Sequence, residues 1–284
     1  MTLHRPPPRI FALIIGINEY ESPRIQNLVG AVPDADAVQD YLQRHLDVPS
    51  NQIRNLRNSG ATRAAIIGEI KAFSFNEKIK EGDPILIYYA GYGSSTGTPK
   101  GWEAGSTGKI EFLVPYDYSS LKDDDPVHGI PDRTLGALLS HLASTKGDNI
   151  VRQTFILCGF IYQLISMRQT VILDCCHSGS GTRNLDPTFK ARAIVVGNIP
   201  SNLDQDIWSA FEWSGRGTVV HSGFARKGLR SHVLLAACHS QELAYERTSR
   251  GVFTVVLLKT LMDIGIDKLT YATLFDRMPP LSSG

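Results

Sequence analysis

Length, composition and charge place this chain among ordinary globular proteins. Its 284 residues suffice for one large domain or two small ones, and 42% apolar with 20% charged residues allow a sizeable buried core. With 29 basic and 28 acidic residues the formal net charge is +1, which removes the electrostatic basis for nucleic acid or an anionic membrane as the main partner. Four unevenly spaced cysteines predict no disulfide framework and are typical of a reducing compartment.

The N-terminal region carries no recognisable targeting signal. The apolar run at residues 10–17 is too short for a signal-peptide core followed by a cleavage site. No stretch reaches the roughly 18 apolar residues that a membrane span requires. We therefore expect a cytoplasmic or nucleocytoplasmic protein that does not act on membranes.

Short apolar runs alternate with helical patterns along the chain. Unbroken runs rich in β-branched and aromatic residues, typical of buried parallel strands, occupy residues 10–17, 84–90, 170–175 and 232–237. Helical spacing of apolar residues predicts helices at residues 34–46, 63–73, 133–142 and 252–261, with Thr62 as the N-cap of the second. This order predicts an α/β sandwich, in which ligands bind outside the carboxyl ends of the strands.

Residues 182–230 differ from the rest of the chain. They are rich in Gly, Pro, Asn, Asp and Arg and have few periodic apolar positions. We interpret them as a long, largely irregular connection, and loops of that length are usually functional or disordered. The connection divides the chain into a larger N-terminal part and a smaller C-terminal part.

Two of the predicted strands run directly into residues that suit catalysis. The strand at 170–173 is followed by Asp174, Cys175 and Cys176, and a cysteine at such a strand end is where a nucleophile meets a substrate. The alternative is that both cysteines are small buried apolar residues. The strand at 85–90 runs into Gly-Tyr-Gly-Ser-Ser.

Together, the segments YYAGYGSS and DCCHSG resemble the caspase-like cysteine peptidases, specifically the metacaspases. The segments FALIIGINEY, EFLVPYDY and HVLLAAC…ELAYE…GVFT also resemble that family, in its order. The resemblance implies one caspase-like domain over residues 1–284, a three-layer α/β/α sandwich with a mostly parallel central sheet. Within it we expect a large-subunit-like part at 1–181, an intersubunit-like connection at 182–230 and a truncated small-subunit-like part at 231–284.

The resemblance also implies roles for individual residues. Cys176 is the nucleophile, and backbone N–H groups near Cys176 and Gly93 stabilise the oxyanion. Asp34 and Asp174 match the acidic residues of a pocket for Arg or Lys, and a bidentate carboxylate–guanidinium pair is strong. For Asp34 the sequence supports a helix N-cap equally well.

The chain departs from the family at Tyr92, which occupies the position of the catalytic histidine. A phenol with a pKa near 10 is only about one part in a thousand ionised at neutral pH, so it makes a poor proton shuttle. Without a basic partner Cys176 stays mostly as the thiol. Neither His177, beside the nucleophile, nor His221 or His232 is expected to replace the missing base.

No cofactor is expected to be required. The family's usual activator is calcium, and Asp132 matches one of its acidic positions, but Arg183 stands where a further carboxylate is expected. The cysteine and histidine spacing does not suit a zinc site, and the Gly-x-Gly segment is not followed by the Gly-Lys-Ser/Thr of a phosphate-binding loop.

Two places differ in length from the family pattern. Residues 151–169 interrupt the approach to the nucleophile strand, and we interpret them as a retained intron, the alternative being an amphipathic insertion that packs as a short helix. We also expect the final strand of the small subunit to be missing, which would leave an uncovered sheet edge. Sequencing the spliced transcript across this region tests the intron hypothesis.

The sequence thus predicts a metacaspase-like cysteine endopeptidase domain that cleaves polypeptides after Arg or Lys, with activity impaired at Tyr92. The alternative function is that of an inactive pseudopeptidase that binds and regulates active relatives. Turnover of an Arg- or Lys-terminated peptide distinguishes the two hypotheses.

Overall fold

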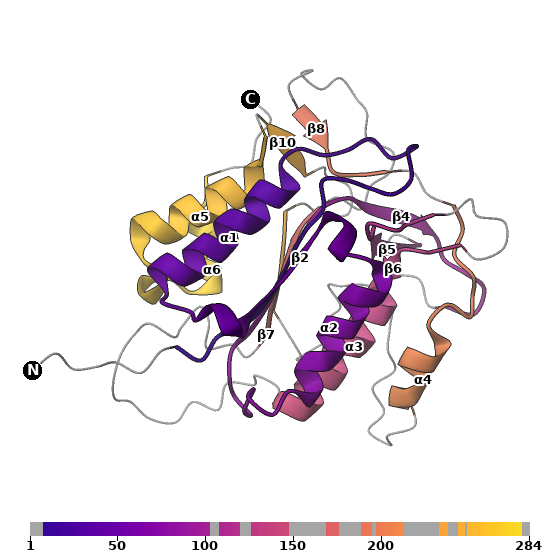
Figure 1. Cartoon of the computed structure of the whole chain (residues 1–284), viewed down its shortest axis with the longest axis horizontal. Coiled ribbons are helices and arrows are strands. Elements are labelled where there is room, and N and C mark those ends of the chain that lie inside the picture. Colours follow the sequence, from indigo (N-terminus) through magenta and orange to yellow (C-terminus); the bar gives the residue numbers. More distant parts are fainter. Residues whose placement is uncertain are drawn as a thin grey trace, which may run out of the picture.

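The centre of the computed structural model is a five-stranded sheet (Figure 1). The structure describes residues 8–102, 108–119, 126–147, 169–175, 189–194, 197–212, 233–237, 244–247 and 249–279. The strand order is β2-β1-β3-β7-β9, and every neighbouring pair is parallel. In chain order these strands are β1 (Phe11–Gly16), β2 (Ile53–Arg57), β3 (Ile85–Ala90), β7 (Gln169–Asp174) and β9 (Val233–Ala236).

The register of the sheet aligns the carboxyl ends of its middle strands. Gly16 of β1 pairs with Ala90 of β3, and Ala90 in turn pairs with Asp174 of β7. All six residues of β1 are buried, as expected for a strand covered on both faces. The residues that follow β1, β3 and β7 therefore emerge at one edge of the sheet.

Helices cover both faces of the sheet, which makes three layers (Figure 1). One face carries α1 (Ala31–His45), α5 (Val252–Ile264) and α6 (Tyr271–Arg277), and the other carries α2 (Arg63–Phe75) and α3 (Asp132–Lys146). Helix α4 (Gln205–Glu212) packs against α3. Short 3-10 turns occupy Ser50–Gln52, Asn58–Gly60 and Ile266–Lys268.

Two small antiparallel sheets lie beyond the carboxyl edge of the central sheet. The first contains β4 (Gly93–Gly97), β5 (Lys109–Leu113) and β6 (Ile130–Pro131). The second contains β8 (Phe189–Ala191), β10 (Tyr245–Arg247) and β11 (Arg250–Gly251). A single parallel bridge between Gly93 and Ala193 links them, so the start of β4 touches the segment that follows β8.

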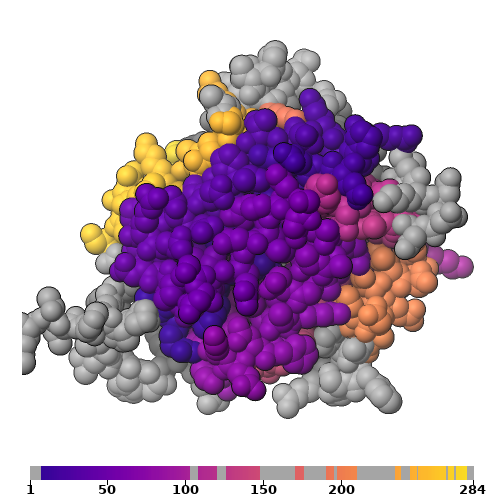
Figure 2. All heavy atoms as spheres, viewed as in Figure 1, coloured from indigo at the N-terminus to yellow at the C-terminus, as the bar shows by residue number. Residues whose placement is uncertain are grey.

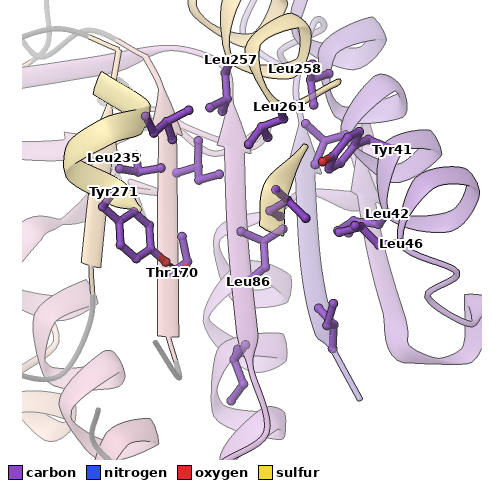
Figure 3. Close-up of a pocket in the computed structure, with 16 residues that line it drawn as sticks. Tyr41, Leu42, Leu46, Leu86, Thr170, Leu235, Leu257, Leu258, Leu261 and Tyr271 are labelled. Atoms are coloured by element: carbon purple, nitrogen blue, oxygen red, sulfur yellow. Dashed lines mark hydrogen bonds between the residues drawn. The ribbon is translucent and has the colours of Figure 1, made fainter. Parts of the chain in front are cut away.

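An apolar cavity lies between the central sheet and the helices of one face (Figure 3). Leucines of α1 and α5 and side chains of β3, β7 and β9 point into it. Its main polar contact is a hydrogen bond of 2.6 Å between the hydroxyl groups of Thr170 and Tyr271. The cavity lies within the hydrophobic core rather than at the carboxyl edge of the sheet.

The surface seen in Figure 2 is formed mainly by the first half of the chain, with the C-terminal helices along one edge. No helix among the described residues is both long and apolar enough to cross a membrane.

The predicted fold class is confirmed, because helices flank a parallel central sheet on both faces. The four predicted strands correspond to β1, β3, β7 and β9, and the four predicted helices to α1, α2, α3 and α5, all within a few residues. Thr62 caps α2 as predicted, with its hydroxyl accepting the Ala65 N–H at 3.2 Å. Residues 151–168 of the predicted insertion lie outside the described residues, and Gln169 begins β7.

Residues 189–194 and 197–212 are the described part of the predicted irregular connection at 182–230, and they contain two regular elements that the sequence analysis did not predict. Strand β8 and helix α4 both fall within this range. The strand pairs with β10, far along the chain, and the helix packs on α3. Neither partner is visible in a local apolar pattern, so the two elements could not be predicted from the sequence of this segment.

Replacement of Leu13 by Ala should test the core around β1. The Leu13 side chain is fully buried, so the lost contacts and the resulting cavity should lower the free energy of unfolding by about 2–5 kcal/mol. Met262 on α5 is 53% exposed, and its replacement by Ala should change that free energy by less than about 0.5 kcal/mol. Equilibrium unfolding in urea measures both changes, and equal effects would contradict this assignment of the core.

Candidate active site

The structure brings several of the predicted site residues together at the carboxyl edge of the sheet. Asp174 ends β7, Tyr92 follows β3 and Gly93 begins β4. Asp34 lies in the first turn of α1, which follows β1, and is completely buried. The carboxylates of Asp34 and Asp174 both contact the same guanidinium group.

This guanidinium group belongs to Arg192, whose side chain is 0% exposed. Its Nη2 lies 2.6 Å from Asp34 Oδ2, and its Nη1 lies 2.9 Å from Asp174 Oδ2. A third carboxylate, that of Glu246 on β10, lies 3.6 Å from Nη2. We call Asp34, Asp174 and Glu246 the acidic pocket.

The charges in the acidic pocket determine the ionisation of Arg192. Burial opposes the charged form of the guanidinium, but the carboxylates of Asp174 and Asp34 outweigh it and raise the pKa of Arg192. A second cation, Arg250, donates from Nε to Asp34 Oδ1 at 2.6 Å and is partly exposed. Among the described residues, Arg192 Nε and Asp174 Oδ1 are buried without a hydrogen-bond partner.

Backbone and hydroxyl groups complete the acidic pocket. Gly251 donates its N–H to Asp34 Oδ2 at 2.7 Å, and a side chain at this position would collide with Arg192 Nη1, 2.8 Å from an added Cβ. Thr254 donates its hydroxyl to Asp174 Oδ2 at 2.6 Å and accepts that of Tyr88, also at 2.6 Å. Glycine is therefore needed at 251 for close approach rather than for an unusual backbone conformation.

Asp34 does not cap α1. The N-cap is Gly30, without a side-chain hydrogen bond, and Asp34 lies inside the helix. Its two carboxylate oxygens accept hydrogen bonds from Arg192, Arg250 and Gly251 instead. The N-cap interpretation of Asp34 is therefore wrong, and its role in substrate binding stays a prediction.

Tyr92 is fixed in place and is not a base. Its side chain is 3% exposed, and its hydroxyl donates to the Gln26 carbonyl at 2.8 Å. Its ring lies 5.2 Å from that of Tyr20, centre to centre, and the Tyr20 hydroxyl accepts the Tyr92 N–H at 2.8 Å. Burial raises the pKa of the Tyr92 phenol to about 12, so it remains protonated at neutral pH.

Backbone hydrogen bonds hold the segment around Arg192 against Gly93. The Gly93 N–H, predicted to be an oxyanion donor, donates to the Arg192 carbonyl at 3.0 Å. Ile194 donates its N–H to the Gly93 carbonyl at 3.3 Å, and Arg192 donates its own to the Ala244 carbonyl at 3.0 Å. Both the side chain and the main chain of Arg192 are therefore bound.

The structure describes only some of the predicted catalytic and metal-binding residues. Cys176 and His177 lie outside the described residues, whereas Cys175 is buried and not in a disulfide. Asp132 begins α3, where its Oδ1 accepts the Arg133 N–H at 2.6 Å. Within the described residues, no group of three or more His, Cys, Asp or Glu side chains could hold a metal ion.

Sequence reasoning missed Arg192, Glu246, Gly251 and Thr254. Arg192 lies in the connection at 182–230, which is rich in Arg, and no local pattern distinguishes it from the other arginines there. The sequence does carry one signal that Arg192 is buried. It lies in the apolar segment Ala-Arg-Ala-Ile-Val-Val, which is an unusual setting for a solvated arginine.

A family model of the caspase domain matches residues 9–279. The chain belongs to this family. The membership supports a cysteine-peptidase type of function, with polypeptides as the class of substrate. A search of curated proteins found no match.

Two solved structures show the same fold as this caspase domain. The protein GSU0716 from Geobacter sulfurreducens has a TM-score of 0.59 and 19% sequence identity, over 96% of this chain and 90% of that one. Caspase-1 from Spodoptera frugiperda has a TM-score of 0.50 and 13% identity, over 95% of this chain and 75% of that one. At these identities the comparisons concern the fold alone.

Replacement of Thr254 by Val should test the hydroxyl that supports Asp174. Valine has nearly the same shape but leaves the Tyr88 hydroxyl unpaired and removes a donor from a buried carboxylate, which should lower the free energy of unfolding by about 1–3 kcal/mol. Replacement by Ser keeps the hydroxyl and should cost less. Denaturant unfolding of both variants measures the difference, and a larger loss in the Ser variant would contradict the role of the hydroxyl.

Proposed function

We propose that this caspase domain is a cysteine endopeptidase of the metacaspase type, specific for Arg and Lys and impaired at Tyr92. The observation that carries the proposal is the pair of buried carboxylates, Asp34 and Asp174, which bind a guanidinium at 2.6 Å and 2.9 Å. Cys176 is the proposed nucleophile, next to Cys175 at the end of β7. The Gly93 N–H is the proposed oxyanion donor.

The specificity follows from the charge and shape of the acidic pocket. Carboxylates on two sides of a planar guanidinium favour arginine, whose Nη atoms reach both of them. A lysine ammonium carries the same charge but lacks the planar fork, so we expect it to bind less tightly. An acidic side chain would meet three carboxylates in the same place and should be rejected.

The impairment follows from the chemistry of Tyr92. A cysteine peptidase needs a base that takes the thiol proton and returns it to the leaving amine. With its pKa at about 12 and its proton donated to Gln26, the Tyr92 hydroxyl does neither at neutral pH. Without such a base, only about a few per cent of the Cys176 thiol is ionised, and attack on the substrate is slow.

A second candidate function is that of a pseudopeptidase that binds polypeptides or active relatives without cleaving them. Two observations favour it, namely the tyrosine at position 92 and the acidic pocket already filled by Arg192. Calcium binding at Asp132 remains a prediction, and no cofactor requirement is proposed. The two functions differ in turnover, which can be measured directly.

Replacement of Tyr92 by His should raise turnover of a peptide that ends in Arg before a chromogenic amine. A general base contributes about 10²–10⁴-fold, and a histidine base should make turnover rise as pH passes about 6.5. Replacement by Phe removes the hydroxyl without adding a base and should show no gain. The assay is run with and without calcium, and with lysine and glutamate peptides as specificity controls.

Replacement of Cys176 by Ala distinguishes the proposed peptidase from the pseudopeptidase. Turnover by the unmodified chain that this variant abolishes would exclude the pseudopeptidase. A Tyr92→His variant that folds but gains nothing over Tyr92→Phe would contradict our account of the impairment. Equal turnover of arginine and glutamate peptides would contradict the proposed specificity.

A further inference from the structure

The main chain at Tyr92 is held by two tyrosine hydroxyl groups. Tyr20, in the segment between β1 and α1, accepts the Tyr92 N–H at 2.8 Å. Tyr89 on β3 places its hydroxyl oxygen between two carbonyl oxygens, 2.7 Å from that of Tyr92 and 2.9 Å from that of Val114. The Tyr92 carbonyl also accepts the Val114 N–H at 3.0 Å. Both peptide groups that flank the Cα atom of Tyr92 are therefore bound.

The close approach of these hydroxyl groups depends on Gly91. A Cβ atom added at this position would lie 2.8 Å from the Tyr89 hydroxyl oxygen and 3.1 Å from that of Tyr20. A larger residue would thus push both hydroxyl groups away from the main chain of Tyr92. The first glycine of the Gly-Tyr-Gly segment is therefore needed so that the two tyrosines can reach the residue that follows it.

Tyr20 is itself fixed by its neighbours along the chain. The N–H of Glu19 donates to the side-chain oxygen of Asn58 at 3.3 Å, and the N–H of Glu21 donates to the Tyr116 carbonyl at 3.0 Å. The Tyr20 side chain is buried, and burial raises the pKa of its phenol, so the hydroxyl stays protonated and neutral. Tyr20 therefore acts as a fixed hydrogen-bonding group and not as a base.

These contacts determine the direction of the side chain at position 92. Binding of both flanking peptide groups fixes the backbone dihedral angles of this residue, and those angles decide which side-chain rotamers are allowed. The ring of Tyr20, 5.2 Å from the ring of Tyr92, restricts the rotamers further. The direction that results leads to the Gln26 carbonyl, which accepts the Tyr92 hydroxyl at 2.8 Å.

The alternative is that these tyrosines only stabilise the core. A buried tyrosine needs a partner for its hydroxyl group, and Tyr88 finds one in the side chain of Thr254. The hydroxyl groups of Tyr20 and Tyr89 differ from that of Tyr88, because they converge on the main chain of one residue from two separate segments. That residue occupies the position of the proposed missing base.

We propose that Tyr20 and Tyr89 are positioning residues, which fix the direction of the side chain at position 92. The inference rests on the proposed function in one respect, namely that position 92 is the place of the catalytic base. A histidine introduced there acts as an effective base only while both hydroxyl groups hold its main chain. The tyrosines act through residue 92 and take no part in proton transfer themselves.

The first experiment measures the direction of the side chain without requiring catalysis. Tyr20→Phe removes one oxygen atom and keeps the ring. By NMR, the Tyr92 amide of this variant should exchange with solvent at least about fivefold faster than that of the unmodified chain, because its acceptor is gone. Nuclear Overhauser contacts between the Tyr92 ring and Gln26 should weaken at least about twofold, because the ring then populates further rotamers.

The matched control is Tyr271→Phe, which also removes one bound tyrosine hydroxyl. That hydroxyl pairs with the Thr170 hydroxyl at 2.6 Å, at the far end of β7 from the candidate active site. This variant should leave both the amide exchange and the ring contacts of Tyr92 as they are in the unmodified chain. Unchanged ring contacts in Tyr20→Phe, or equal losses in Tyr20→Phe and Tyr271→Phe, would overturn the proposal.

Tyr89→Phe covers the case in which Tyr20→Phe does not fold. It removes the hydroxyl that binds the Tyr92 carbonyl and should weaken the same ring contacts with Gln26. If neither variant folds while Tyr271→Phe does, the two hydroxyl groups support the whole fold rather than one side chain, and the proposal is wrong.

The second experiment adds each substitution to Tyr92→His and measures turnover of the arginine peptide. Tyr20→Phe should lower kcat at least about tenfold, because a base that is no longer aimed correctly loses most of its effect. KM should stay within about twofold, since Asp34 and Asp174 are unchanged. Rates are divided by the folded fraction, so that a loss of stability is not counted. Tyr271→Phe should change neither constant.

The two experiments separate the failures. Turnover by Tyr92→His that Tyr20→Phe leaves unchanged would overturn the positioning role and leave the proposed function standing. Absence of turnover by Tyr92→His, together with weakened contacts of the Tyr92 ring in Tyr20→Phe, would overturn the proposed peptidase and leave the positioning role supported.

Discussion

The ion pairs of Arg192 with Asp34 and Asp174 join segments that are far apart in the sequence. Asp34 is separated from Arg192 by 158 positions and from Gly251, which also binds its carboxylate, by 217. The pairs thus connect α1, β7, β8 and the start of α5 around one buried guanidinium. The charge of Arg192 constrains the positions of α1, β7 and β10, because a buried guanidinium is tolerated only with its carboxylates in place.

The sheet and its main helices could be predicted from the sequence because their signals are local. The apolar runs around Leu13 and Val171 have no polar interruption, since both faces of each strand are covered. The hydroxyl of Thr62 caps α2 as its position before an apolar stripe predicted. In such segments burial and periodicity point to the same structure, so the prediction needs no knowledge of distant contacts.

The position of the Arg192 guanidinium between Asp34 and Asp174 could not be predicted in the same way. The roles of Asp34 and Asp174 came from a resemblance between motifs, and their carboxylates do meet at one point. Nothing local identifies Arg192 as their partner, because a short strand such as β8 depends on pairing with β10 rather than on its own three residues. The need for Gly251 likewise depends on how closely α5 approaches Asp34, which is a property of the assembled fold.

Tyr92 and Arg192 are both buried at the carboxyl edge of the sheet, and each binds a partner within the chain. The main chain of Arg192 is held by its carbonyl on the Gly93 N–H, and its guanidinium is held by Asp34 and Asp174. The Tyr92 phenol is buried and donates its hydroxyl to the Gln26 carbonyl. A buried polar group is stable only when a partner within the chain replaces the water it has lost. The guanidinium and the phenol therefore both restrain the segments that follow the carboxyl ends of the strands, one through carboxylates and the other through a main-chain carbonyl.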